Sequence, residues 1–135
     1  MIHQLPVRIY YEDTDAGGVV YHSNYLKYAE RARSEFLYAS GFTNLGLIER
    51  GLGIMIRRCE MDFKAPAKLE DIITVHTKID SIGGASMVMD QTVKRGEQVL
   101  VVMKIHVVFV DPKALKPVRL PADVREQFEK YVEKE

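Results

Sequence analysis

The sequence predicts an α+β protein in which one long helix lies on a face of an antiparallel β-sheet. Three observations support this prediction. Only the segment between Ser23 and Gly41 in the body of the chain places its apolar residues at helical spacing. The segments after it alternate apolar and polar residues, as strands do. Glycine-containing turns separate these segments, and they are short enough to join antiparallel neighbours.

The first strand is expected at residues 6–11, which are rich in branched and aromatic side chains. An acidic loop with two glycines follows at residues 12–18. The helix is expected from about Ser23 to Ser40, and Gly41 ends it. Its core-facing residues are Tyr25, Ala29, Ala32, Phe36 and Leu37, and the side chains expected to point away are Lys27, Glu30, Arg31, Arg33 and Glu35.

The rest of the chain is predicted as long strands and one terminal helix. The strands are expected at residues 53–63, 71–82, 86–94 and 98–111. The last strand is apolar on both faces near Val101, which favours a position at the sheet centre or against another subunit. A single helix cannot cover such a sheet, which favours dimerisation. The terminal helix is expected at residues 122–134, with Val124, Phe128, Tyr131 and Val132 on its apolar side.

Composition limits the class of protein. The 135 residues fit one domain, residues 1–135, and 47% of them are hydrophobic. Lys plus Arg and Asp plus Glu number 19 each, which argues against a nucleic-acid-binding domain. The single Cys59 indicates neither an intramolecular disulfide nor a cysteine metal site. With no signal peptide and no apolar run near the ~20 residues that span a membrane, we expect a cytoplasmic protein without an integral membrane segment.

The segment from Tyr11 to Tyr25 is where chemistry is most plausible. It joins an acidic loop containing Gly17 and Gly18 to the start of the helix. A helix start offers unpaired N–H groups and a positive dipole end, which suit a developing oxyanion. Asp15 lies seven residues before His22, so the loop is expected to fold its carboxylate over the helix start. An ordinary acidic turn with a helix cap fits the same residues about equally well.

The contiguous block from Tyr11 to His22, YEDTDAGGVVYH, resembles the signature of the hotdog-fold acyl-CoA thioesterases. It is most similar to the YbgC-type enzymes associated with the Tol-Pal cell-envelope genes, within the 4-hydroxybenzoyl-CoA thioesterase family. Residues 28–35, 63–67 and 111–112 support the resemblance. It implies a long central helix wrapped by an antiparallel sheet and hydrolysis of an acyl-CoA thioester without a cofactor or metal. It also implies a link to lipid and cell-envelope metabolism.

The same resemblance assigns roles to individual residues. Asp15 matches the catalytic carboxylate, and the backbone N–H of His22 matches the oxyanion donor. The side chains of Tyr11 and His22 match polar groups that line the pocket. Whether Asp15 acts as a general base or as a nucleophile stays open. We further expect substrate contacts from Gly17, Gly18, Val20 and Tyr21, and CoA phosphate contacts from the cations Arg57, Arg58 and Lys64, with Lys68 nearby.

Partners and alternatives complete the hypothesis. We expect a homodimer or homotetramer, and an acyl carrier protein is a further candidate partner. The main alternative function is a module that binds acyl groups or acyl carrier protein, with hydrolysis secondary. The pair Asp13 and Asp15 is also typical of magnesium-dependent haloacid-dehalogenase-type phosphatases, but Gly17 and the missing doubly wound sheet disfavour that class. A solvated charged face is the alternative for the cations.

Overall fold

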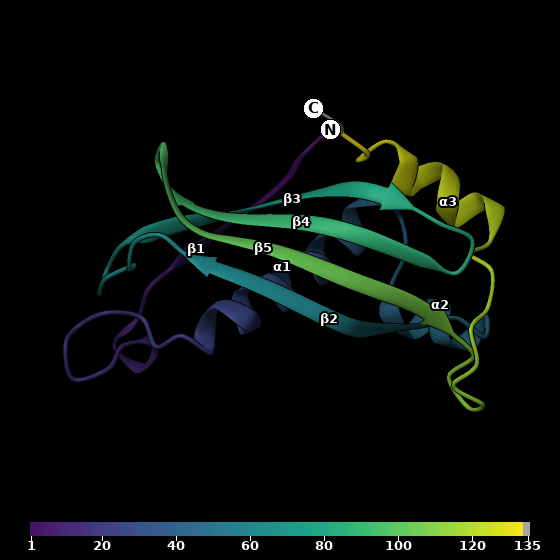
Figure 1. Ribbon diagram of the computed structural model, residues 1–135, viewed down its shortest axis with the longest axis horizontal. Helices are drawn as coiled ribbons and strands as arrows, with labels where there is room; N and C mark the ends of the chain where they lie inside the picture. Colours follow the sequence, from purple (N-terminus) through teal and green to yellow (C-terminus); the bar gives the residue numbers. More distant parts are fainter. Residues whose placement is uncertain (134–135) are drawn as a thin grey trace.

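A five-stranded antiparallel sheet curves around α1 in the computed structural model, which describes residues 1–133 (Figure 1). The strand order is β1-β3-β4-β5-β2, so β1 and β2 are the two edges. This helix-in-sheet arrangement is the expected α+β hotdog fold. The elements are β1 (His3–Arg8), α1 (Asn24–Ala39), α2 (Asn44–Glu49), β2 (Gly53–Phe63), β3 (Ile72–Ile82), β4 (Ser86–Arg95), β5 (Gln98–Val110) and α3 (Ala122–Glu129).

Helix α1 forms as its spacing predicts. All five predicted core residues are buried, and Gly41 follows the helix with a φ of 93°, a left-handed conformation that glycine adopts without strain. The side chain of Arg33 differs from the prediction. It lies between helix and sheet rather than in solvent, because its guanidinium Nη1 donates a 2.9 Å hydrogen bond to Oε1 of the buried Gln91 on β4.

Strand β5 lies inside the sheet, between β4 and β2. From Met103 to Phe109 its residues are alternately buried and partly exposed, and the buried side chains face α1. The opposite face is more polar than the sequence analysis expected. It carries Lys104, whose Nζ lies 3.3 Å from Asp90 Oδ1. The predicted apolar outer face on β5 is therefore limited to the residues near Val102, which is 39% exposed.

The first strand and a second helix also depart from expectation. β1 covers residues 3–8 rather than 6–11, and Tyr11–Asp13 form a 3-10 turn. Pro6 is accommodated inside this strand because β1 is an edge that pairs only with β3. The short helix α2 was not predicted. It begins after Thr43, whose Oγ1 accepts a 2.9 Å hydrogen bond from the Gly46 N–H.

The terminal helix is shorter than predicted. It ends at Glu129 because the following residues pair with β3, where Ile79 N–H donates to the Tyr131 carbonyl at 2.8 Å. Glu133 N–H in turn donates to the Ile79 carbonyl at 3.1 Å. The predicted end at residue 134 lies outside the described residues. The predicted apolar side is confirmed, since Val124, Phe128 and Tyr131 are buried and Val132 packs on the core.

The two ends of the sheet differ in what they hold. The loop between β1 and α1 extends from one end, beside the C-terminal end of β2 (Figure 1). Helix α2 lies at the other end. None of the helices within residues 1–133 is long and apolar enough to cross a bilayer.

Candidate active site

The segment that carries Asp15 is a tight hairpin. Asp15 N–H donates to the Val19 carbonyl at 2.9 Å, and Gly18 N–H donates back to the Asp15 carbonyl at 3.0 Å. Gly18 has a φ of 78°, so a residue with a side chain is strained there. Gly17 is adjacent, and its N–H donates to Oδ1 of Asp15 at 2.8 Å. The glycines thus let the chain reverse closely around the Asp15 carboxylate.

The Asp15 side chain is exposed and turns back onto its own loop. Within the described residues, no hydrogen bond joins its carboxylate to the amides of the helix start, so the expected fold-over is not seen in the single chain. Oδ2 has no protein donor in the same range. One carboxylate oxygen is therefore fixed, and the other faces solvent, where it is free to engage a water molecule or a reacting carbon.

Asp13 connects the hairpin to the helix. Its carbonyl accepts hydrogen bonds from Tyr21 N–H at 3.1 Å and from Asn24 Nδ2 at 2.9 Å. Its carboxylate accepts from Tyr10 N–H at 2.8 Å. The two aspartates therefore bond to different parts of the loop, and Asp13 has a structural role. The buried Asn24, which the sequence analysis missed, is a helix-start residue that holds this junction.

The start of α1 offers unpaired amides. Asn24 N–H and Tyr25 N–H donate to the carbonyls of Tyr21 and His22, at 2.9 and 3.3 Å. Across residues 1–133, the N–H groups of His22 and Ser23 have no protein acceptor, and the Ser23 side chain does not cap the helix. These amides lie at the positive end of a 16-residue helix. The predicted oxyanion donor at His22 thus has its N–H free.

Three aromatic rings lie beside these amides and form an aromatic wall: those of His22, Tyr25 and Phe63. The His22 ring lies 4.7 Å from the Phe63 ring, centroid to centroid, and the Tyr25 ring lies 5.8 Å from it. Tyr25 hydroxyl also accepts a 3.0 Å hydrogen bond from Ala67 N–H. Phe63 is 45% exposed at the end of β2, so it forms an accessible apolar surface next to the helix start. In the sequence, the one signal for a role of Phe63 near the site was its position in residues 63–67, a segment that supports the family resemblance.

The remaining predicted side chains near the loop differ in their exposure to solvent. Tyr11 and Tyr21 are 81% and 59% exposed, so both are accessible from solvent. Val20 is instead buried in the core, and its N–H donates to the Ala67 carbonyl at 2.9 Å. This bond ties the hairpin to the connection between β2 and β3. The Val20 side chain therefore supports the loop and does not line its surface.

The predicted cations do not form one cluster. Arg57 and Arg58 lie at a β-bulge in the middle of β2, while Lys64 follows the end of that strand. Arg58 and Lys64 are six positions apart in extended chain, which is about 20 Å. Arg58 pairs with Glu60 and Lys64 with Asp62, each at 2.7 Å and exposed. Lys64 follows Phe63 directly in the sequence, and Lys68 pairs with Val19 of the Asp15 hairpin.

Comparison with known proteins shows that the chain is similar to thioesterases. The model of the thioesterase-like superfamily matches residues 10–128. The acyl-CoA thioester hydrolase YbgC of Escherichia coli O157:H7 is 40% identical over 124 residues, covering 91% of this chain and 92% of the relative. The acyl-CoA thioesterase YbgC of Haemophilus influenzae is also 40% identical over 124 residues, covering 91% of each. The solved structure "Probable Thioesterase from Bartonella henselae" aligns with a TM-score of 0.83 at 38% identity, over 90% of this chain and 100% of that one.

Proposed function

The chain belongs to the thioesterase-like superfamily, and we propose that it hydrolyses an acyl-CoA thioester to free CoA and a carboxylic acid, with Asp15 as the catalytic carboxylate. The observation that carries this proposal is that one segment holds both a carboxylate and unpaired backbone N–H groups. A solvent-facing carboxylate on a glycine hairpin is followed at once by a helix start with unpaired N–H groups. Hydrolysis of a thioester needs both kinds of group.

The proposed chemistry balances without a cofactor. Water that gives a proton to Asp15, or Asp15 itself, attacks the thioester carbon, and the carbonyl oxygen becomes an oxyanion that accepts from the His22 N–H. In the base route, the proton then passes from Asp15 to the leaving thiolate or to solvent. Collapse of this intermediate breaks the carbon–sulfur bond. The CoA thiolate leaves readily because the pKa of such thiols is about 8–9. In the nucleophile route, water then cleaves the acyl–Asp15 anhydride. Both routes yield the same acid, and the choice between base and nucleophile stays open.

We propose that two chains pair through β2. This strand has a hydrogen-bonded neighbour on one side only, and it exposes Met55, Ile56 and Phe63. An unpaired apolar edge is a template for another strand. In a two-fold antiparallel pairing, the start of one β2 lies beside the end of the other. Each Phe63 would then face the partner's Met55 region, and two such dimers would give a homotetramer.

The CoA nucleotide is proposed to lie near the exposed cations of this strand. Lys64 follows Phe63, whose ring contacts His22, and Lys68 pairs with Val19 of the Asp15 hairpin, so these two lysines are the candidates within one chain. Arg57 and Arg58 sit half a strand away, so they would serve a site completed by the partner's loop. Removing these charges should raise KM for an acyl-CoA more than it lowers kcat, the pattern of lost uniform binding.

The cellular setting belongs to the same proposal. The resemblance of the Tyr11–His22 block to Tol-Pal-associated enzymes favours a role in cell-envelope lipid metabolism, in the cytoplasm where CoA esters are made. Acyl carrier protein is an alternative acyl donor, since it presents the same thioester on the same pantetheine arm.

The alternative function is an acyl-binding module whose hydrolysis is secondary. It would have no need of the carboxylate of Asp15. The direct test incubates the purified protein with a series of acyl-CoAs and titrates the released thiol. Turnover that is saturable with respect to the acyl-CoA supports the hydrolase. Stoichiometric binding of the acyl-CoA without thiol release would establish the module instead.

A further inference from the structure

The second arm of the Asp15 hairpin pairs with the connection between β2 and β3, as two short antiparallel strands do. Val20 N–H donates to the Ala67 carbonyl at 2.9 Å, and Leu69 N–H donates to the Gly18 carbonyl at 3.2 Å. An antiparallel bridge between the intervening residues completes the pairing. The position of the hairpin backbone therefore depends on the position of this connection.

The direction of the Asp15 carboxylate depends in turn on the hairpin backbone. Gly17 N–H donates to Oδ1 of Asp15 at 2.8 Å, and a Cβ on Gly17 would lie only 3.2 Å from the same oxygen. The carboxylate thus lies close against the hairpin turn, and a shift of the hairpin would move it. Misplacing a reacting group by about 1 Å can cost about 10²-fold in rate.

The connection itself makes a turn that needs support. Glu70 has a φ of 69°, a left-handed conformation that is unfavourable for a residue with a side chain. Two hydrogen bonds close the turn: Asp71 N–H donates to the Lys68 carbonyl at 3.1 Å, and Lys68 N–H donates to Asp71 Oδ2 at 2.9 Å. Glu70 N–H also donates to the Ile9 carbonyl at 2.9 Å. The Asp71 carboxylate is therefore part of the turn that carries the paired segment.

The side chain of Arg95, the last residue of β4, holds this turn at both ends. Its Nη1 donates to Asp71 Oδ2 at 2.6 Å and to the Pro66 carbonyl at 3.3 Å. Its Nη2 donates to Gln98 Oε1 at 2.7 Å, so the first residue of β5 orients the guanidinium. The Arg95 and Asp71 side chains are 31% and 24% exposed, so water screens the pair only in part. The β4–β5 turn and the Asp15 hairpin lie at the same end of the molecule (Figure 1).

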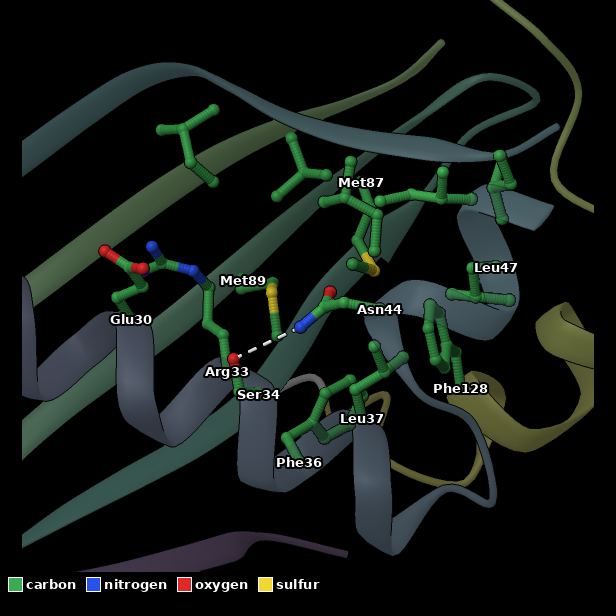
Figure 2. A pocket seen from close by; sticks show the side chains of 15 residues that line it. Glu30, Arg33, Ser34, Phe36, Leu37, Asn44, Leu47, Met87, Met89 and Phe128 are labelled. Carbon is green, nitrogen blue, oxygen red and sulfur yellow. Dashed lines mark hydrogen bonds between the residues drawn. The ribbon is translucent and has the colours of Figure 1, made fainter. Parts of the chain in front are cut away.

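Arg33 offers a comparison with Arg95. It also reaches from one element to another, from α1 to β4, but its 2.9 Å hydrogen bond goes to the neutral amide of Gln91. Figure 2 shows Arg33 at one end of a cavity of about 380 Å³ between α1, α2 and the sheet. Arg95 instead binds a carboxylate and a backbone carbonyl of the same turn. Its charge and its planar set of donors are therefore both directed at that turn.

We propose that Arg95 is a positioning residue for thioester hydrolysis. By holding the turn at Pro66 and Asp71, it keeps the paired hairpin, and with it the Asp15 carboxylate, in the reactive position. The inference rests on the proposed function, because it acts through Asp15. Arg95 itself touches neither the thioester nor the CoA nucleotide. Its loss should therefore lower kcat and leave KM for the acyl-CoA unchanged.

The first test compares the wild type with Arg95→Met, which keeps the apolar stem and removes every donor. The kcat for an acyl-CoA should fall about tenfold or more, while KM stays within about twofold. Arg50→Met is the matched control, because Arg50 makes a two-bond pair with Asp123 between α2 and α3, at 2.9 and 2.7 Å. It should leave kcat unchanged. A raised KM at unchanged kcat in Arg95→Met would make Arg95 a contact for the CoA phosphates and would overturn the proposal.

A double variant separates positioning from a general loss of stability. In the Asp15→Asn background, Arg95→Met should lower the residual kcat no further, because its effect passes through the Asp15 carboxylate. An equal fold-loss of kcat in both backgrounds would overturn the proposal.

Amide hydrogen exchange tests the structural link without a substrate. Val20 and Leu69 are the two donors of the pairing, and Ile105 lies in the middle of β5. In Arg95→Met, exchange at Val20 and Leu69 should accelerate about tenfold or more, and by a larger factor than at Ile105, because the hairpin opens locally. Equal acceleration at all three amides, or none at Val20 and Leu69, would overturn the proposal.

Arg95→Lys keeps the inference testable if Arg95→Met does not fold. It retains the charge but cannot reproduce the guanidinium contacts with Asp71, Pro66 and Gln98 together, so kcat should lie between those of the wild type and Asp15→Asn. A wild-type kcat in Arg95→Lys would then overturn the proposal. A normal kcat in Asp15→Asn refutes the proposed function, whereas a normal kcat in Arg95→Met beside an inactive Asp15→Asn refutes this inference alone.

Discussion

The hydroxyl of Tyr25, in the first turn of α1, accepts a 3.0 Å hydrogen bond from the backbone N–H of Ala67, and both residues are buried. Val20 N–H donates to the Ala67 carbonyl from the other side at 2.9 Å. The connection between β2 and β3 is therefore bonded to both the hairpin of Asp15 and the helix start. Since these are the two halves of the proposed site, Ala67 fixes their relative position.

Tyr25→Phe should weaken this junction. It leaves the buried Ala67 N–H without an acceptor, which costs about 1–3 kcal/mol. We expect lower thermal stability and a lower kcat, because the helix start loses its fixed position. Thermal unfolding and thiol release measure the two effects. Tyr38→Phe is the control, since Tyr38 is half exposed on the same helix and should change neither. Unaltered stability in Tyr25→Phe would show that this bond does not hold the site.

The same connection gives the protein an acid-sensitive element. Asp71 Oδ2 accepts from Lys68 N–H at 2.9 Å and lies 2.6 Å from Arg95 Nη1, which also donates to the Pro66 carbonyl at 3.3 Å. Burial opposes ionisation of Asp71, but the Lys68 amide and the Arg95 guanidinium outweigh it and lower its pKa. The stabilisation is thus complete above the ordinary aspartate pKa of about 3.9. It is lost as pH falls through the lower folded-state pKa.

Asp71→Asn should therefore destabilise the fold at pH 7 by roughly 1–2 kcal/mol, since the pair is partly solvated. The difference in the free energy of unfolding between wild type and Asp71→Asn should shrink as the pH falls below about 3.9. Urea unfolding across this range measures it. Asp62→Asn, which breaks an exposed pair with Lys64, should have little effect at any pH. A wild-type advantage that persists below the folded-state pKa would contradict the account.

The β2 edge is open to a spectroscopic test. Cys59 is the sole cysteine of the chain, and it is exposed in the middle of this strand. If two chains pair there, one spin label per chain should show dipolar broadening that disappears when unlabelled protein is added in excess. Light scattering on unlabelled protein at micromolar concentration should report a dimer or tetramer. A monomer by scattering, with no broadening, would rule out the shared edge.

The proposed oxyanion role of His22 belongs to its backbone N–H, and two substitutions distinguish that group from the side chain. His22→Ala keeps the N–H and should cost only a moderate loss, through weaker packing on Phe63. His22→Pro removes the N–H, and loss of an oxyanion donor costs about 10²–10³ in kcat. Proline is tolerated near a helix start, and thermal unfolding verifies the fold. Equal activity of the two variants would place the oxyanion elsewhere.

Sequence pattern predicted the elements whose signal is long and local. Strands β2 to β5 match their expected bounds within two residues, because alternation persists over ten or more positions. The misses are short or depend on distant partners. Helix α2 has six residues with Gly46 inside, too few for a periodic signal. α3 ends early because the chain beyond it pairs with Ile79, a contact that its own sequence does not encode.

The local geometry of the candidate site was predictable to a similar degree. The Tyr11–His22 block located the hairpin and the free amide, since both are properties of contiguous residues. Phe63 reaches the helix start only through the curvature of the sheet. Arg33 looked solvent-facing by helical spacing, yet its long side chain reaches Gln91 on β4. The cations of β2 are close in sequence but are spread along an extended strand.

The most direct test of the central claim compares kcat for acyl-CoA hydrolysis between the wild type and Asp15→Asn. Asparagine keeps the shape and the acceptor for Gly17 N–H but removes the charge and the basicity. Glu12→Gln removes a charge from the same loop and serves as the control. We predict that Asp15→Asn binds acyl-CoA normally and loses about 10²-fold or more in kcat, while Glu12→Gln is unaffected. Near-normal turnover by Asp15→Asn, with its mass verified and no contaminating thioesterase, would contradict the mechanism.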